Sequence, residues 1–216
     1  MSAIARNAAN HITTSGVFTA DAITNASVTG ITTLANAEDG ITLISSQTAS
    51  ASASISFTTG IDSTYKAYKF VFVNIHPGTD AVTFEFNLST DNGSNYNVVK
   101  TSTYFRPYHD EADTLTGLSY NGGLAQSTAY QLLSSPGDVN ADSDQGLQGT
   151  MNLFNPSSTT YVKHFICVNN YTAQTDFNIN AFIAGYANTT SAINAIRFQM
   201  SSGNIDAGTI YMYGIK

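Results

Sequence analysis

The stretch YKAYKFVFVNIHP, residues 65–77, decides the fold. Successive side chains of an extended chain point to opposite faces. One face carries Tyr68, Phe70 and Phe72, and the other carries Lys69, Val71 and Val73. Both faces are largely apolar, and such a run of β-branched and aromatic residues is typical of a central strand in a sandwich. Pro77 lacks a backbone N–H and ends the pairing. We therefore expect this strand in the middle of the core, with other strands against it.

Further strands are predicted at near-regular spacing on both sides of this stretch. They cover residues 82–89, 96–105, 147–154, 161–169, 177–186, 193–200 and 209–215, and the segment 41–58 is one long strand or two strands separated by a bend. Asp91-Asn92-Gly93 predicts a hairpin that pairs 82–89 with 96–105. No segment has a convincing helical period. The pattern predicts an all-β fold, an antiparallel β-sandwich of jelly-roll type spanning residues 41–216.

Residues 1–40 differ from the sandwich, because their apolar residues are isolated and keep neither helical nor strand spacing. Those residues are Ile4, Ile12, Val17, Phe18, Ile23, Val28, Ile31 and Leu34. A segment of this kind cannot bury enough apolar area to fold alone. It is disordered, lies along a larger body, or winds with copies of itself, and the regular recurrence of apolar residues favours the last two. We expect an extended N-terminal segment for attachment or oligomerisation.

The composition excludes several classes of partner. Charged residues make up 11% of the chain, its net charge is −7, and its eight basic residues are scattered singly. Without a basic stripe, neither nucleic acid nor an anionic membrane surface is an expected partner. No N-terminal apolar core predicts a signal peptide, and no run is long and apolar enough to predict a membrane span. We expect synthesis in a cytoplasm.

Catalytic and metal motifs are not found in the sequence. The single cysteine, Cys167, allows no intramolecular disulfide, and its apolar run predicts a small buried side chain. His76 and His164 are predicted to be satisfied turn or core residues. The motifs of serine hydrolases, zinc proteases and P-loops are missing. The sequence therefore predicts no enzyme activity, no cofactor and no metal.

Two acidic segments keep an alternative open. Residues 108–113, YHDEAD, could hold a cation or supply acid–base groups, although acidic residues in a loop usually face water. Residues 138–144 alternate oxygen side chains as calcium loops do, but Ser143 and Gly149 stand where that pattern requires Gly and Glu. Both segments lie in residues 106–146, which are predicted to be mostly loop and, at that length, functional or interfacial.

Tyrosines are the better candidates for surface binding. Tyrosine offers a rigid amphipathic surface at interfaces and on sugar faces, although ordinary loop packing is the more frequent role of a loop tyrosine. Tyr104, Tyr108, Tyr120, Tyr130 and Tyr171 flank or occupy the predicted loops. The candidate surface-binding residues are Tyr108, His109, Asp110, Tyr120 and Tyr130.

Three strings carry a family resemblance. QTASASASISFTTGIDSTYKAYKFVFVNIHP, FNPSSTTYVKHF and SSGNIDAGTIYMYGIK resemble the virion structural proteins of marine tailed phages (cyanophage and pelagiphage type), the tail-fibre-like family. The resemblance covers about residues 43–216 and carries no catalytic residue. It implies an oligomeric virion protein exposed on the particle, in the tail or the head.

Three hypotheses follow. The first is a homotrimeric virion surface protein, anchored by residues 1–40, that contacts other virion proteins and a host-surface glycan; its role is tail fibre or spike, or alternatively capsid decoration. The second is a virion-borne glycan depolymerase, whose paired carboxylates would come from Asp110, Glu111 and Asp113 or from the acids of 138–144. The third, a cellular lectin-like module, is disfavoured because no secretion signal is predicted.

Overall fold

The computed structural model describes residues 40–173 and 175–216. These residues form twelve β-strands and no helix. The strands are β1 Ile41–Thr48, β2 Ile55–Phe57, β3 Ala67–Pro77, β4 Phe84–Ser89, β5 Lys100–Asp110, β6 Thr116–Asn121, β7 Gln131–Leu132, β8 Leu147–Phe154, β9 Lys163–Ala173, β10 Phe177–Ala187, β11 Ala195–Met200 and β12 Ile205–Ile215. Because this part of the chain contains no helix, none is present that could cross a membrane. The predicted anchor residues, Ile4 to Leu34, lie outside the described residues.

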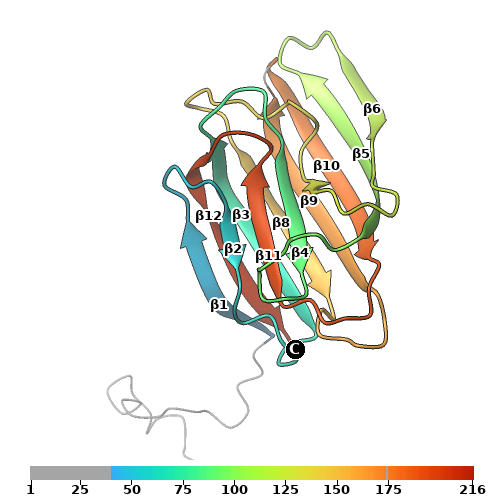
Figure 1. Cartoon of the computed structure of the whole chain (residues 1–216). Helices are drawn as coiled ribbons and strands as arrows, with labels where there is room; N and C mark the ends of the chain where they lie inside the picture. Colours follow the sequence, from blue (N-terminus) through green and yellow to red (C-terminus); the bar gives the residue numbers. More distant parts are fainter. Residues whose placement is uncertain (1–39, 174) are drawn as a thin grey trace, which may run out of the picture. The chain divides into compact units, whose positions relative to one another are not determined.

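Two antiparallel sheets pack face to face (Figure 1). The larger sheet has eight strands in the order β1-β12-β3-β8-β9-β10-β5-β6, and the smaller has four in the order β2-β11-β4-β7. This arrangement confirms the predicted antiparallel β-sandwich, whereas the jelly-roll subtype stays a prediction. Of the long segment 41–58, the structure makes two strands, β1 and β2, in different sheets.

The opening stretch is an interior strand, as predicted. β3 pairs with β12 on one side and with β8 on the other. Its residues Tyr68, Phe70 and Phe72 are buried against the smaller sheet, where Phe198 of β11 contacts both Phe70 and Phe72. The other face of β3 is only partly buried, although it is nearly as apolar.

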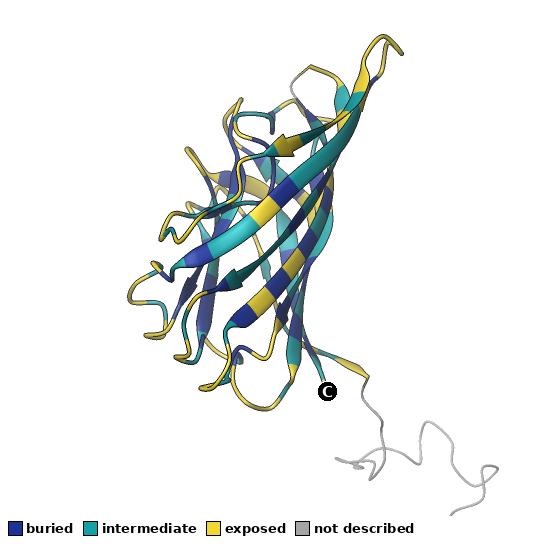
Figure 2. Ribbon diagram, turned by 90° about the vertical axis from the view of Figure 1, so that its right-hand side faces the viewer, coloured by how far each residue is buried: buried dark blue, intermediate teal, exposed yellow. Residues whose placement is uncertain are grey.

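Burial alternates along the strands of the larger sheet, as Figure 2 shows by the change of colour from residue to residue. In β9 every second residue is buried, from Lys163 through Phe165 and Cys167 to Ala173, while His164 and Ile166 are exposed. The predicted burial of Cys167 is confirmed. The expectation of a core or turn position for His164 is wrong, because the alternation places its side chain on the side of the sheet away from the core. We call that side the outer face.

The predicted hairpin between residues 82–89 and 96–105 is wrong. Asn92 and Gly93 do form a tight turn with positive φ angles, but β4 then pairs with β11 and β7, and β5 pairs with β10 and β6. Residues 90–99 therefore carry the chain from the smaller sheet to the larger one. Asn92 and Gly93 determine the turn locally, whereas the partners of β4 and β5 are determined by which strand faces are buried between the two sheets.

The prediction that residues 106–146 are mostly loop is wrong for its first part. β5 continues to Asp110 and forms a hairpin with β6. Asp110 stabilises that hairpin: its carboxylate accepts hydrogen bonds from the backbone N–H groups of Thr114 and Leu115 and from the Thr114 hydroxyl. These bonds lower the pKa of Asp110. The end of β5 was predicted to be loop because many of its residues are polar. A strand needs apolar side chains only at alternate positions, so a polar sequence does not exclude one.

Candidate interaction surface

The outer face of the larger sheet carries a row of cross-strand neighbours that crosses all eight strands. From β6 to β1 the row is Tyr120, Phe105, Phe182, Val168, Thr150, Val71, Tyr211 and Ser46. Phe105 and Phe182 stack with ring centroids 4.9 Å apart, and Tyr120 packs against Phe105 at 6.1 Å. Such pairs stabilise neighbouring strands, and here they also form a continuous aromatic surface.

The apolar character of the outer face extends beyond this row. Among the described residues, nine large hydrophobic side chains are exposed, and all but Leu115 and Tyr161 lie on this face. Those on the face are Ile41, Leu43, Val73, Leu118, Tyr120, Phe154 and Ile166. Scattered exposed apolar residues are ordinary, but a contiguous patch of them marks an interaction surface.

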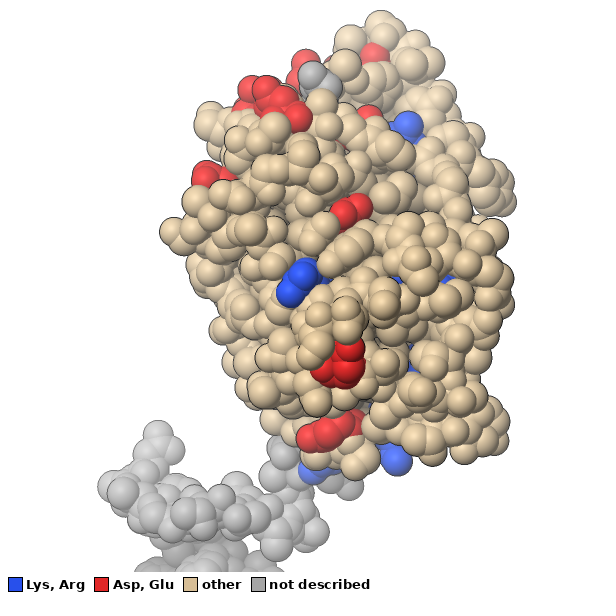
Figure 3. Space-filling view, viewed as in Figure 1, with Lys and Arg blue, Asp and Glu red and all other residues tan. Residues whose placement is uncertain are grey.

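The outer face is almost free of charge. Among the strand residues that alternation places on it, only Lys69 of β3 and Asp206 at the start of β12 are lysine, arginine, aspartate or glutamate. The low charge is not confined to this face: Figure 3 shows the view of Figure 1, in which charged side chains lie singly or in small groups on a mostly uncharged surface. Depletion of charge with enrichment of aromatic residues is the composition of an interface core.

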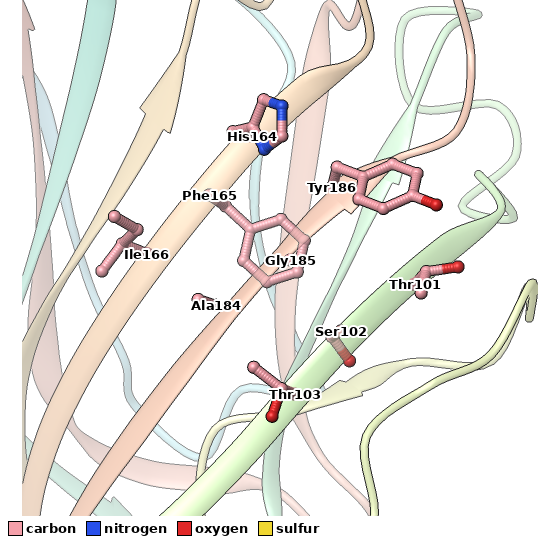
Figure 4. Close-up of a pocket in the computed structure, with 9 residues that line it drawn as sticks. All are labelled: Thr101, Ser102, Thr103, His164, Phe165, Ile166, Ala184, Gly185 and Tyr186. Carbon is pink, nitrogen blue, oxygen red and sulfur yellow. The ribbon is translucent and has the colours of Figure 1, made fainter.

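A shallow hollow of about 560 Å³ lies in this face, over β5, β9 and β10 (Figure 4). Ala184 lies between Ile166 and Thr103 across the strands, at the end opposite Tyr186 and His164. Tyr186 and His164 stand together at one end, with ring centroids 5.9 Å apart. Because Gly185 has no side chain and Ala184 has a small one, the hollow can accept an apolar side chain from another molecule.

The structure does not gather the predicted surface-binding residues into one site. Tyr120 is 80% exposed on the outer face, and His109 points to the same side. Tyr108 points to the opposite side, where it packs against Phe177. Asp110 is buried, and its carboxylate is occupied by the hydrogen bonds of the β5–β6 hairpin. Tyr130 lies just before β7, near the smaller sheet, and partial burial raises its pKa. Of these five residues, Tyr120 is the exposed aromatic residue of the apolar surface, at its β6 edge.

Two of the tyrosines expected near loops belong to the core. Tyr104 and Tyr171 are buried, and both hydroxyls lie within hydrogen-bonding distance of the Ser135 hydroxyl, at 3.2 and 3.0 Å. Burial raises the pKa of Tyr104 far above its usual value. This buried network ties the segment after β7 to the larger sheet, which is a structural role.

The acidic segments show structural contacts. Asp138 forms an ion pair with Arg106 at 2.5 Å, and Asp142 accepts a hydrogen bond from the Asn140 amide at 2.7 Å. His109 and Asp113 form an exposed pair at 3.1 Å. Within residues 40–173 and 175–216, no three histidine, cysteine or acidic side chains are grouped as metal ligands.

Sequence reasoning did not identify the outer face, although its signal is present. The outward residues of β3, β9, β10 and β12 include Val71, Ile166, Phe182 and Tyr211, so these strands are apolar on both faces. Because these strands are apolar on both faces, both faces were expected to be buried inside the protein. Among the described residues, however, the smaller sheet covers the inner face and nothing covers the outer face. No protein-family model matches the chain, and no curated protein matches it.

Proposed function

We propose that this protein is a structural protein of a phage particle, acting by assembly with copies of itself and by surface binding rather than by turnover. The observation that carries the proposal is the outer face, an apolar, aromatic and nearly uncharged surface across eight strands. A face of this composition is stabilised when another surface covers it.

A second copy of the same chain is the partner that this face fits best. A surface with so few charges can be covered by a neighbouring copy without strong like-charge repulsion, and its charged strand residues are Lys69 and Asp206. Assemblies of identical chains usually have closed symmetry, most often as dimers and also as threefold rings. We propose a homotrimer in which each outer face, with the Ala184 hollow, contacts a neighbouring subunit.

The phage role rests on the sequence resemblance, with support from the low surface charge. In the favoured form, residues 1–40 fasten the sandwich to the tail, and it projects as part of a fibre or spike that contacts a host-surface glycan. In the alternative form, the protein decorates the capsid head and stabilises the shell. The jelly-roll topology belongs to the same proposal.

The assembly is tested by light scattering on the purified chain. We expect a mass three times that of one chain, and a smaller mass for Ile166→Lys and Leu118→Lys, because each places a charge in the apolar face. Tyr161→Lys and Leu115→Lys are matched controls, because these exposed side chains lie off the face. Circular dichroism checks that each variant folds. A monomeric wild type, or face variants that remain trimeric, would contradict the proposed interface.

The particle role is tested separately with antibodies raised against the purified protein. We expect them to label intact phage particles in electron micrographs, at the tail in the favoured form and over the head in the alternative. Failure to label, with no peptides of the chain in digests of purified particles, would overturn the phage proposal and leave the self-assembly unaffected.

A further inference from the structure

A buried lysine faces a buried amide where the chain crosses between the sheets. Lys100 begins β5 in the larger sheet and Asn87 lies in β4 of the smaller one, and both are fully buried. Lys100 Nζ is 2.5 Å from Asn87 Oδ1 and 2.9 Å from the backbone oxygen of Val98. The ion pairs among the described residues, Arg106–Asp138 and His109–Asp113, do not include this lysine. A buried ammonium without a carboxylate is costly, so its presence requires an explanation.

The amine is in the form that can react. Burial lowers the pKa of Lys100 to about 7, because a low-dielectric site disfavours the charged form. A large fraction of the amine is therefore neutral at neutral pH, with a free electron pair. Desolvated lysines of this kind are the ones that act as nucleophiles.

The amide is held in one orientation. Asn87 Oδ1 accepts a hydrogen bond of 2.9 Å from the backbone N–H of Leu88, a donor placed to stabilise negative charge on that oxygen. Asn87 Nδ2 donates to the backbone oxygens of Tyr96 and Thr128, at 2.7 and 3.0 Å. Since a C=O bond is about 1.23 Å long, the amide carbon lies no more than about 3.7 Å from Nζ, close to the distance of a near-attack pair.

We infer that Lys100 and Asn87 form an intramolecular isopeptide bond. Lys100 Nζ, which donates an N–H to Oδ1 in the structure, moves to the face of the amide carbon, and its electron pair forms the new C–N bond. The tetrahedral intermediate carries negative charge on Oδ1, against the Leu88 N–H, and positive charge on Nζ, against the Val98 oxygen. One proton passes from Nζ to Nδ2, the C–Nδ2 bond breaks, and ammonia leaves. No oxidation occurs and no co-reactant is consumed.

The second buried lysine provides an internal comparison. Lys163 is also fully buried, but its Nζ donates to the backbone oxygen of Thr189 at 3.0 Å, and no side-chain amide is bonded to it. Lys163 is therefore a lysine of low exposure whose amine has no amide electrophile beside it. The crosslink between Lys100 and Asn87 would join the two sheets covalently at the crossover of residues 90–99.

The experiment is the intact mass of the full chain, after incubation at neutral to mildly alkaline pH. We expect a mass about 17 Da below that of the sequence, the mass of one ammonia. Trypsin should no longer cleave after Lys100, and tandem spectra should locate the link to Asn87. Hydroxylamine treatment separates this loss from a succinimide at an Asn-Gly pair, because a succinimide opens and an isopeptide bond persists.

Lys100→Met and Asn87→Ala should both retain the full mass, and Lys163→Met should lose ammonia as the wild type does. Peptide mapping of the wild type needs no variant to fold, so it tests the bond independently. A full-mass wild type with normal cleavage after Lys100, or a loss that persists in Lys100→Met, would overturn the inference.

Discussion

Phe198 is the residue around which the aromatic core is built. Its ring lies within 6.5 Å, centroid to centroid, of Phe57, Phe70, Phe72, Phe84 and Phe86, which come from three other strands. Most of these contacts are edge-to-face or tilted, the arrangements that favour the aromatic quadrupoles. The sequence placed Phe198 in a strand, but it could not distinguish this ring from the other phenylalanines.

Phe198→Ala should lower the free energy of unfolding by about 3–5 kcal/mol, because it leaves a cavity where several rings meet. Urea titration followed by fluorescence or circular dichroism measures the change. Tyr161→Ala, at a side chain 69% exposed, is the matched control and should change stability by no more than about 0.5 kcal/mol. Equal effects at the two positions would contradict the packing described here.

Asp91 gives stability a dependence on acid. Hydrogen bonds from the Ser89 hydroxyl, and then from Asn95, lower the pKa of this carboxyl from 3.8 to about 2. Because the folded-state pKa is the lower one, the stabilisation is present above pH 3.8 and is lost as pH falls through about 2. The melting temperatures of wild type and Asp91→Asn should therefore differ most at pH 5–7 and converge toward pH 2. A difference that does not change with pH would count against this role.

At the scale of elements, the pairing of β3 with β12 depends on a glycine. Gly208 has a φ of 113°, and a Cβ there would lie 2.4 Å from the backbone oxygen of Asn74, itself at a positive φ of 52°. The register of the two strands shifts here, between Ala207 and Thr209. Bulges of this kind bend a sheet and are fixed by the residues that permit them.

Gly208→Ala should lower the free energy of unfolding by about 1–3 kcal/mol, since both the φ angle and the backbone contact are unfavourable for alanine. Gly122→Ala is the control, because nothing lies within 4 Å of the added Cβ. Denaturant melts of the two variants measure the difference, and a neutral Gly208→Ala would show that the bulge relaxes freely.

Most strand positions could be predicted from the sequence, although β6 was missed, whereas strand partners could not. Alternation located β8 at residues 147–154, as the structure has it, because each strand carries its own period of two. Partners depend on which faces are buried together, and Asp91-Asn92-Gly93 contains no information on that. The outer face was missed for a related reason: apolar residues on both sides of β9 indicate contact on both sides, but not whether the second contact is within the chain or with another chain.

At the scale of the whole molecule, the sandwich should fold without the N-terminal segment. A chain of residues 40–216 should unfold in one cooperative transition, because all described strands and the whole aromatic core lie within it. If the outer face is the interface, light scattering should give this shorter chain the same number of subunits as residues 1–216. A monomeric 40–216 beside a trimeric full chain would assign the oligomer to the N-terminal segment instead.

The position of β12 has a consequence for biosynthesis. β1 joins the larger sheet only through β12, and the paired hydroxyls of Thr48 and Thr209 are 161 positions apart. During translation, β1 and one edge of β3 therefore have no partner until residues 205–215 have left the ribosome. Pairings this distant in sequence are slow to form and leave apolar edges open to aggregation. Emergence of β12, rather than synthesis of the earlier strands, should limit the yield of folded protein.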